Sequence, residues 1–300
     1  MDISQDSSKR KSFRRGIIIL VVIVCVFVVI TRFFDREGGY PFGERIAIVE
    51  VKGVINNSEE IIRALHKYKK DKSVKAIVVR VNSPGGAVAP SQEIYEEINK
   101  IKTEKRVVVS MGSMAASGGY YIASAADKIF ANPGTITGSI GVLIEFANIE
   151  ELLSKLGIKG HVIKSGKYKD TLSPTREITD EERNYLQAVA DNIHAQFIDS
   201  VAKSRGLERE SVVDLADGRI LTGAEAQKLG LVDFLGNFQD AIEYAGKIAG
   251  IKGTPQVIYP QKSRFSILDL LFNQVEKRIK EIIDNQLFRA SYLFTSQKPY

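Results

Sequence analysis

The sequence predicts an α/β fold with a largely parallel sheet, preceded by a single N-terminal membrane segment. Two observations predict the fold: runs of β-branched residues that are apolar on both faces, and segments of helical spacing that alternate with them. A third observation, fifteen uncharged residues at 16–30, predicts the membrane segment. With 300 residues, 44% hydrophobic and 26% charged, the chain is long enough to bury a sizeable core.

Charge and cysteine content exclude several classes of protein. The formal net charge is +6, and the first 15 residues supply half of it through five basic and two acidic side chains. The remaining residues contain no basic run interleaved with aromatic residues, so we expect no nucleic acid partner. One cysteine, Cys25, and three histidines without metal-ligand spacing exclude a disulfide framework and argue against a metal centre. We expect no cofactor.

The apolar segment 16–30 reads GIIILVVIVCVFVVI. Fifteen helical residues cover only ~23 Å of a ~30 Å hydrocarbon core, but Thr31 to Phe34 lengthen the segment and flanking arginines can reach the interfaces. A buried soluble helix is rarely apolar on every side, and no Ala-x-Ala-like cleavage site follows. We therefore expect a basic cytoplasmic tail at 1–15 and an uncleaved signal anchor at 16–34. The positive charges before the anchor predict that the N-terminus stays in the cytoplasm and that the body of the chain lies on the other side of the membrane. We expect this membrane to be a bacterial inner membrane.

A short Gly-rich linker, 35–44, precedes the domain that we expect at 45–260. Its first half alternates strands with helices of amphipathic spacing, and a Ser cap starts the first helix. Strands are expected at 46–51, 74–81 and 106–111, and helices at 58–68 and 91–101.

The second half continues the alternation less regularly. Thr179 followed by three acidic residues is a strong signal for a helix start. A helix is expected from about Ser117, strands at 128–131 and 161–165, and helices at 148–156 and 179–204. The C-terminal tail, 261–300, contains an amphipathic stretch at 264–288 with an apolar stripe.

The stretch Gly112-Ser-Met-Ala-Ala-Ser117-Gly-Gly-Tyr-Tyr121 is the strongest candidate for chemistry. Its small residues allow a sharp bend between a strand and a helix, which would present the Ser117 side chain. Backbone N–H groups at the start of the helix would favour a developing anion. The plainer interpretation, in which Ser117 only caps the helix, accounts for these residues equally well.

The loop Ser83-Pro84-Gly85-Gly86 follows an apolar strand. Two glycines let the backbone approach a ligand closely and offer free N–H donors. The loop lacks the spacing of a phosphate-binding motif, and it can also be an ordinary turn.

A nucleophilic serine needs a base, and the three histidines are poorly placed. His66 and His194 lie within expected helices, and His161 starts an expected strand. A lysine base would have to be neutral at its working pH. Lowering its pKa from ~10.4 to near 7 costs roughly 4.6 kcal/mol, which requires desolvation in an apolar pocket.

Lysine candidates lie together in the run Ile-Lys-Ser-Gly-Lys-Tyr-Lys-Asp at 163–170. They are Lys164, Lys167 and Lys169. Spacing alone favours a solvated basic turn here and does not choose among the three.

Five blocks of sequence, taken in order, resemble the bacterial signal peptide peptidase A family in its short single-repeat form, within the Clp protease/crotonase superfamily. The blocks cover most of residues 45–250, and the helical tail adds least to the resemblance. They are Ser-Pro-Gly-Gly (83–86), Met-Ala-Ala-Ser-Gly-Gly-Tyr-Tyr (114–121), Thr-Gly-Ser-Ile-Gly-Val (137–142), Ser-Gly-Lys-Tyr-Lys-Asp (165–170) and Asp-Gly-Arg-Ile-Leu-Thr-Gly-Ala-Glu-Ala (217–226).

The resemblance implies a Clp protease/crotonase-like fold and a serine endopeptidase with a Ser–Lys dyad. It implies Ser117 as nucleophile, Lys169 as general base and Ser139 as the residue that orients the lysine. The oxyanion hole would use Gly118 and either Gly85 or Gly86. It also implies a homo-oligomer whose protomers share each site, and clipped signal peptides in the membrane as substrates.

Three other functions remain open from the sequence. A peptidase of the same superfamily could act on other membrane proteins, as partners of stomatin-like proteins do. A crotonase-type acyl-CoA enzyme would share the fold, although it would require an acidic catalytic residue. A catalytically inactive oligomeric scaffold would not react with an active-serine phosphonate probe.

Overall fold

The computed structural model describes residues 22–24, 26, 43–259 and 289–293. Contacts divide the chain into two units, Met1–Gly43 and Glu44–Tyr300. The expected membrane segment 16–34 lies outside the described residues except for 22–24 and 26, which are helical, and the expected amphipathic stretch 264–288 lies wholly outside them. Within the part that is described, no helix combines the length and the apolar character needed to cross a bilayer.

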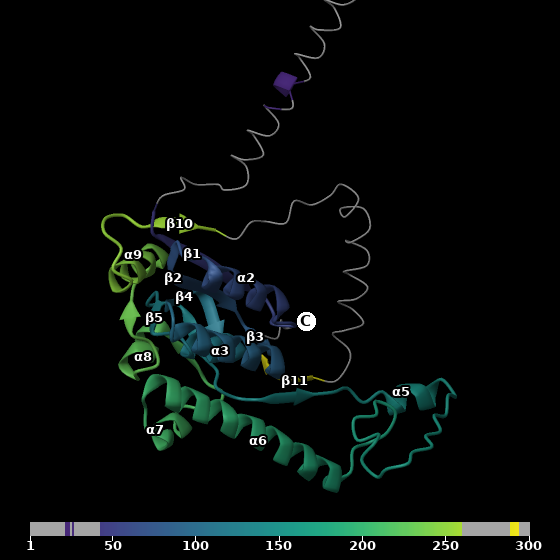
Figure 1. Ribbon diagram of the computed structural model, residues 1–300. Coiled ribbons are helices and arrows are strands. Elements are labelled where there is room, and N and C mark those ends of the chain that lie inside the picture. The colour runs from purple at the N-terminus through teal and green to yellow at the C-terminus, as the bar shows by residue number, and fades with distance from the viewer. Residues whose placement is uncertain (1–21, 25, 27–42, 260–288, 294–300) are drawn as a thin grey trace, which may run out of the picture. The chain divides into compact units, whose positions relative to one another are not determined.

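A twisted sheet forms the centre of the second unit (Figure 1). Six of its described strands follow one path in which every neighbouring pair is parallel, which confirms the predicted α/β fold with a largely parallel sheet. In spatial order they are β10 (Gln256–Ile258), β1 (Arg45–Lys52), β2 (Val74–Ser83), β4 (Arg106–Ala116), β5 (Lys128–Ala131) and β9 (Phe234–Leu235).

Helices cover both faces of this sheet, which is why the strands are apolar on both sides. Alternate residues of a strand point to opposite faces, so Val49 packs with the helices of one face and Ile48 with those of the other. The first face carries α2 (Glu59–Lys70), α3 (Val88–Lys102), α4 (Gly118–Ser124) and α6 (Asp180–Arg205), and the second carries α9 (Phe238–Ile248). The shorter helices are α5 (Glu150–Lys155), α7 (Arg209–Val213) and α8 (Gly223–Lys228).

The predicted start of α6 is confirmed at Thr179. Its hydroxyl accepts a hydrogen bond from the backbone N–H of Glu182, and the Glu182 carboxylate accepts one from the N–H of Thr179. The helix ends at Gly206, whose φ of 63° places it in the left-handed region. These two end signals define a helix of 26 residues.

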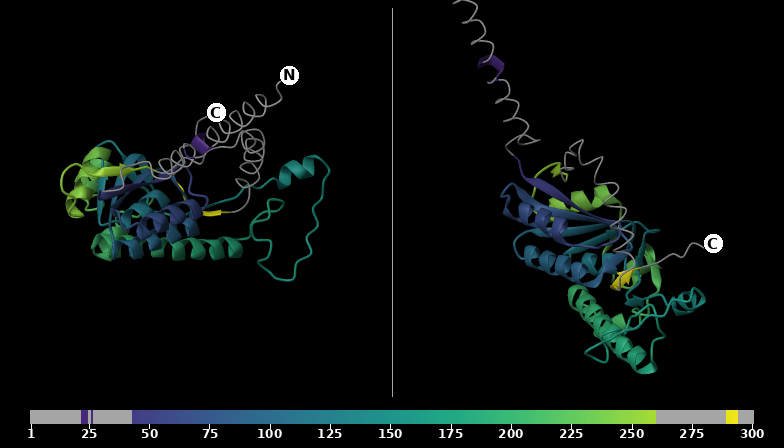
Figure 2. Two further views of the ribbon diagram at one scale, coloured as in Figure 1. Left: turned by 45° about the horizontal axis from the view of Figure 1, so that its top comes forward. Right: turned by 90° about the vertical axis from the view of Figure 1, so that its right-hand side faces the viewer.

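The predicted strand at 161–165 is wrong. These residues form no strand, and Val162 and Ile163 are exposed, so the apolar run has no neighbour to pair with among the described residues. They belong to a segment that we call the arm, residues 146–178, which contains α5 and is otherwise loop. Figures 1 and 2 show the arm extending away from the sheet before the chain returns into α6.

Two small strand groups lie at the carboxyl end of β4. Strand β6 (Ile136–Gly138) pairs in parallel with the last residues of β4, and β8 (Ile220–Thr222) pairs with β6 in the antiparallel sense. A separate three-stranded antiparallel sheet places β11 (Arg289–Leu293) between β3 (Gly85–Ala87) and β7 (Leu143–Glu145). Both groups adjoin the turn after β4, where the candidate nucleophile lies.

Candidate active site

Ser117 occupies the single residue between β4 and α4. Its backbone has φ 54° and ψ −119°, a sparsely populated conformation that costs on the order of 1–3 kcal/mol in a residue other than glycine. Two hydrogen bonds hold it: the Ser117 N–H donates to the carbonyl of Gly138 at 2.8 Å, and its carbonyl accepts from the N–H of Tyr121 at 2.8 Å. The turn therefore fixes the direction of the Ser117 side chain through the backbone.

Small residues after Ser117 are a steric requirement of this turn. A Cβ on Gly118 would lie 2.7 Å from Ser91 Oγ and 3.3 Å from the backbone nitrogen of Gly86. A Cβ on Gly119 would lie 2.8 Å from the carbonyl oxygen of Ser83. The glycine pair of the turn and the glycine loop after β2 therefore lie against each other.

Ser139 lies beside Ser117 because of the way β6 pairs with β4. Ala116 pairs with Gly138, so the two serines emerge from the ends of adjacent parallel strands. Ser139 also has a positive φ, 50°, and its N–H donates to the carbonyl of Arg219 at 2.8 Å. Ser117 and Ser139 are the two residues other than glycine with positive φ among the described residues, and they lie side by side.

The hydrogen bonds of the glycine loop fix the directions of its backbone groups. Gly85 has φ 100°, and its N–H donates to the hydroxyl of Ser83 at 3.1 Å. The Gly85 carbonyl and the Ala87 N–H both bond to Ile55, at 2.9 and 2.8 Å. Because successive residues of a strand direct their backbone groups to opposite sides, the N–H and carbonyl of Gly86 face away from Ile55.

Lys169 lies in the arm and is exposed. Its backbone N–H donates to the carbonyl of Gly166 at 3.1 Å, and within the described residues its side chain makes no hydrogen bond or ion pair. The structure of one chain therefore brings together Ser117, Ser139 and the glycines, and does not bring Lys169 to them.

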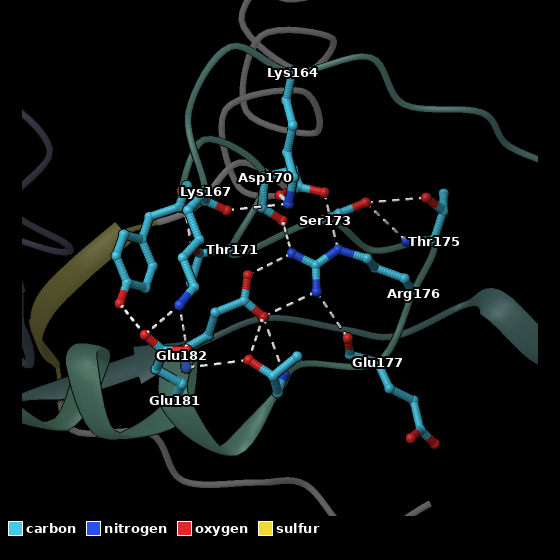
Figure 3. Close-up of polar contacts among 12 residues, drawn as sticks. Lys164, Lys167, Asp170, Thr171, Ser173, Thr175, Arg176, Glu177, Glu181 and Glu182 are labelled. Carbon is cyan, nitrogen blue, oxygen red and sulfur yellow. Dashed lines mark hydrogen bonds and ion pairs between the residues drawn. The ribbon is translucent and has the colours of Figure 1, made fainter.

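The segment around Lys169 is held by a network of charged side chains (Figure 3). Arg176 bonds to Asp170 at 2.9 Å and to Glu182, in the first turn of α6, at 2.5 and 2.9 Å. The Arg176 guanidinium, followed by the Lys164 amine, holds the pKa of the Asp170 carboxyl well below its usual range. Arg176 and the N–H of Thr179 lower the pKa of Glu182 to about 2. The carboxylates of Asp170 and Glu182 consequently stay charged at every pH at which a lysine could be neutral.

The same network separates the three candidate lysines. Lys164 pairs with Asp170 at 2.5 Å, and Lys167 pairs with Glu181 at 2.5 Å. The hydrogen bond from Lys167 to the Glu181 carboxylate raises the pKa of Lys167, which opposes a role as a base. Lys169 has no carboxylate partner among the described side chains.

The histidines are not brought to Ser117. His66 of α2 contacts Glu97 of α3, with Nε2 2.7 Å from Oε1. His161 lies in the exposed arm, and His194 lies within α6, where its buried Nε2 has no hydrogen-bond partner in the described part of the chain. A Ser–His pair is therefore absent from the described residues.

Sequence reasoning missed two residues that shape this site. Ser91 of α3 fills the space beside Gly118 and donates from Oγ to the carbonyl of Ala87 at 2.9 Å. Arg176 joins the lysine segment to α6. A serine in the first turn of a helix and an arginine in a loop carry no periodic signal. The six-residue spacing of Arg176 from both carboxylates was the only available hint.

Comparison with known proteins assigns this domain to the Clp-like peptidases. The model of the Clp protease family matches residues 42–136, and that of Peptidase family S49 matches residues 99–252. The chain belongs to Peptidase family S49 and is a serine-type peptidase.

Individual relatives fit this assignment. A Synechocystis protein named as a protease is 47% identical over 210 residues, which cover 69% of this chain and 76% of the relative. An Enterococcus faecium protein named as a signal peptide peptidase SppA is 42% identical over 188 residues, 62% of this chain and 55% of the relative. Among solved structures, a mutant of ClpP1 from Listeria monocytogenes has a TM-score of 0.43 at 21% identity, covering 65% of this chain and 93% of that one.

Proposed function

We propose that this chain is a membrane-anchored serine endopeptidase that uses Ser117 and Lys169 to degrade clipped signal peptides in or at the membrane. The observation that carries the proposal is the strained turn at Ser117, which adjoins the N–H groups of Gly118 and Gly86. Such a turn presents a hydroxyl and two backbone donors to one reacting carbonyl group.

In the proposed reaction, Ser117 Oγ attacks the carbonyl carbon of the scissile peptide bond and its proton passes to Lys169 Nζ. The N–H groups of Gly118 and Gly86 bind the oxyanion. Gly86 is favoured over Gly85 because the Gly85 N–H already donates to Ser83. The lysine then protonates the leaving amine. In the second half of the reaction, Lys169 takes a proton from water, which attacks the acyl-enzyme carbonyl, and returns that proton to Ser117 Oγ as the ester bond breaks. Ser139 would accept or donate a hydrogen bond at Nζ and orient it.

The exposed position of Lys169 supports a site that is shared between two copies of the chain. A lysine can act as a base only where burial disfavours its charged form, and none of the described residues covers Lys169 in the exposed arm. The arm exposes several large apolar side chains, which is unusual for a surface that faces only water. They are Ile149, Leu152, Leu156, Ile158, Val162 and Ile163. A second copy that covers this surface would bury them and could supply the serine.

Mixing two inactive variants tests the shared site. Ser117→Ala and Lys169→Ala chains, co-expressed with different affinity tags and purified through both tags, should recover about a quarter of wild-type peptide hydrolysis. Random assembly gives that fraction, because one interface in four pairs an intact serine with an intact lysine. Each variant alone should stay inactive. Absence of recovery in doubly purified oligomers would refute the shared site and leave the Ser–Lys chemistry standing.

The membrane location and the substrate class rest on the sequence and on a relative. The apolar segment 16–34 with basic residues before it supports an anchor with the peptidase domain outside the cytoplasm. The Enterococcus faecium relative carries the name of a signal peptide peptidase, and the aligned region is 55% of its length.

A substrate comparison tests the class. The purified full-length chain in detergent should hydrolyse the apolar core of a signal peptide with a kcat/KM at least about tenfold above that for a polar peptide of equal length, because burial of each apolar side chain contributes roughly 1.5–3 kcal/mol. Ser117→Ala protein is the control for contaminating proteases. Folded membrane proteins are included in the same assay as competing substrates. If the chain cleaved them in preference to the signal peptide, the result would support the alternative function, a peptidase that acts on other membrane proteins. No hydrolysis and no labelling by a serine-directed phosphonate probe would refute the proposal.

A further inference from the structure

We propose that Arg176 is a positioning residue for the general base: it fixes the backbone beside Lys169 relative to α6, and it offsets the charge of the carboxylate next to the base. The inference rests on the proposed function, since it assigns a further role within the same site. Arg176 lies in the arm, and all of its side-chain hydrogen bonds go to the arm or to the first turn of α6.

Each of the five N–H groups of the Arg176 guanidinium has an acceptor (Figure 3). Nε donates to the Asp170 carboxylate at 2.9 Å. One terminal nitrogen donates to the carbonyl of Glu177 and to the carboxylate of Glu182, both at 2.9 Å. The other donates to the backbone carbonyl of Asp170 at 2.9 Å and to Glu182 at 2.5 Å. A planar fork with every donor engaged fixes the groups that it bridges relative to one another.

The bond to the Asp170 carbonyl holds the peptide chain directly after Lys169. At this point the chain is otherwise shaped by short turns, such as the one in which the Lys169 N–H donates to the carbonyl of Gly166 at 3.1 Å. Turns of this kind set the local shape of a segment and do not attach it to the rest of the protein. Arg176 supplies the attachment through Glu182 of α6.

Two ion pairs attach the lysine segment to α6 in the part of the chain that the structure describes, and they differ in exposure. The side chains of Lys167 and Glu181 are 64% and 55% exposed, whereas those of Arg176 and Glu182 are 27% and 5% exposed. Ion pairs that face water contribute little to stability, but a buried carboxylate is strongly destabilised when its partner is removed. Arg176 is therefore the stronger attachment of the two.

Arg176 also compensates the charge that lies next to the proposed base in the chain. Asp170 directly follows Lys169, and an unpaired carboxylate there would favour the protonated amine. Asp170 instead pairs with Arg176 at 2.9 Å and with Lys164 at 2.5 Å. These two cations, Arg176 first, hold the pKa of the Asp170 carboxyl well below its usual range. The carboxylate thus stays charged, and cations other than the base match its charge.

Three variants of the full-length chain test this role. Arg176→Gln removes both the fork and the charge, whereas Arg176→Lys keeps the charge and loses the fork. Arg183→Gln is the matched control, because Arg183 is an exposed residue of α6 whose side chain has no ion pair among the described residues.

For peptide hydrolysis, we expect Arg176→Gln to lower kcat by about 10- to 100-fold with KM within about twofold of wild type, because a misplaced base slows the chemical step. The pH at which kcat/KM reaches half of its maximum should rise by about one unit, since the loss of a cation favours the protonated lysine. Arg176→Lys should lower kcat by a similar factor and keep the wild-type midpoint. Arg183→Gln should match the wild type in both.

An unchanged pH midpoint in Arg176→Gln would overturn the proposal even if kcat fell, because a fall in kcat alone is also expected from a loss of structure. A wild-type kcat in this variant would overturn it as well. Thermal unfolding of each variant is measured alongside.

A measurement without catalysis separates this inference from the proposed function. Full-length Ser117→Ala chains, with and without Arg176→Gln, are acetylated with acetic anhydride across a pH series, and mass spectrometry compares Lys169 with the exposed Lys203. Because only the neutral amine reacts, Arg176→Gln should shift the labelling curve of Lys169 upward by about one pH unit and leave that of Lys203 in place. Such a shift supports the inference even if no hydrolysis is ever found. Identical Lys169 curves would overturn it, while hydrolysis by the wild-type chain would leave the proposed function intact.

Discussion

Replacing Ser117 by alanine is expected to lower kcat/KM for peptide hydrolysis by a factor on the order of 10⁶, the scale seen when a catalytic serine is removed. The substitution deletes one oxygen atom and leaves the backbone hydrogen bonds to Gly138 and Tyr121 in place. Alanine would take on the same backbone strain at φ 54°, so the melting temperature should stay within a few degrees of wild type. The measurements are steady-state hydrolysis, thermal unfolding and labelling by an active-serine phosphonate.

Ser113→Ala is the matched control for this variant. Ser113 lies in β4, four residues before Ser117, and is exposed. It should keep wild-type hydrolysis and phosphonate labelling. A Ser117→Ala chain that is still labelled at the wild-type rate would assign the nucleophile to another serine, and Ser139 would then be the first to examine.

Replacing Lys169 by alanine or by arginine is expected to lower kcat/KM by about 10³-fold or more, because general-base assistance disappears in both variants. Arginine keeps the positive charge and cannot become neutral, so its failure would distinguish a base from a simple electrostatic role. The wild-type kcat/KM should rise with pH and then level off, as expected for a reaction that needs its general base unprotonated. Both are measured by hydrolysis of one peptide across a pH series.

Lys167→Ala is the comparison for the lysine variants. It removes the ion pair with Glu181 that helps to hold the arm on α6, so a loss of up to about tenfold fits a positioning effect. If Lys167→Ala abolished hydrolysis and Lys169→Ala preserved it, the base would be Lys167, and the interpretation of the ion-pair network would be wrong.

The sequence predicted those parts of the fold that depend on local pattern. Apolar β-branched runs identified β1, β2 and β4, and Thr179 identified the start of α6. The predicted strand at 161–165 is wrong because an apolar run favours burial but does not determine which part of the protein covers it. No neighbour within the described residues covers Val162 or Ile163.

The candidate site was likewise predictable only in those parts that depend on local sequence. Small residues around Ser117 indicated a tight turn, whereas the close approach of Gly118 to Gly86 was expected only through the family resemblance. The small sheet could not be predicted, since it joins residues 85–87 to residues 289–293 through backbone groups that carry no sequence signal. Three lysines in one run were equivalent by spacing alone. The structure gives two of them carboxylate partners, Asp170 for Lys164 and Glu181 for Lys167.

Helix α6 fixes the distance and the orientation of the lysine segment relative to the peptidase body. Its second half is anchored, with Phe197 and Val201 buried and Arg205 bonded to Asp233 at 2.7 Å, whereas its first turn holds the arm through Glu181 and Glu182. At 1.5 Å and about 100° per residue, the number of residues between these anchors sets both the reach and the angular phase of the arm. One residue more or less would turn the lysine segment by over a quarter of a revolution. The length of α6 thus sets where the lysine segment lies relative to the sheet and its helices.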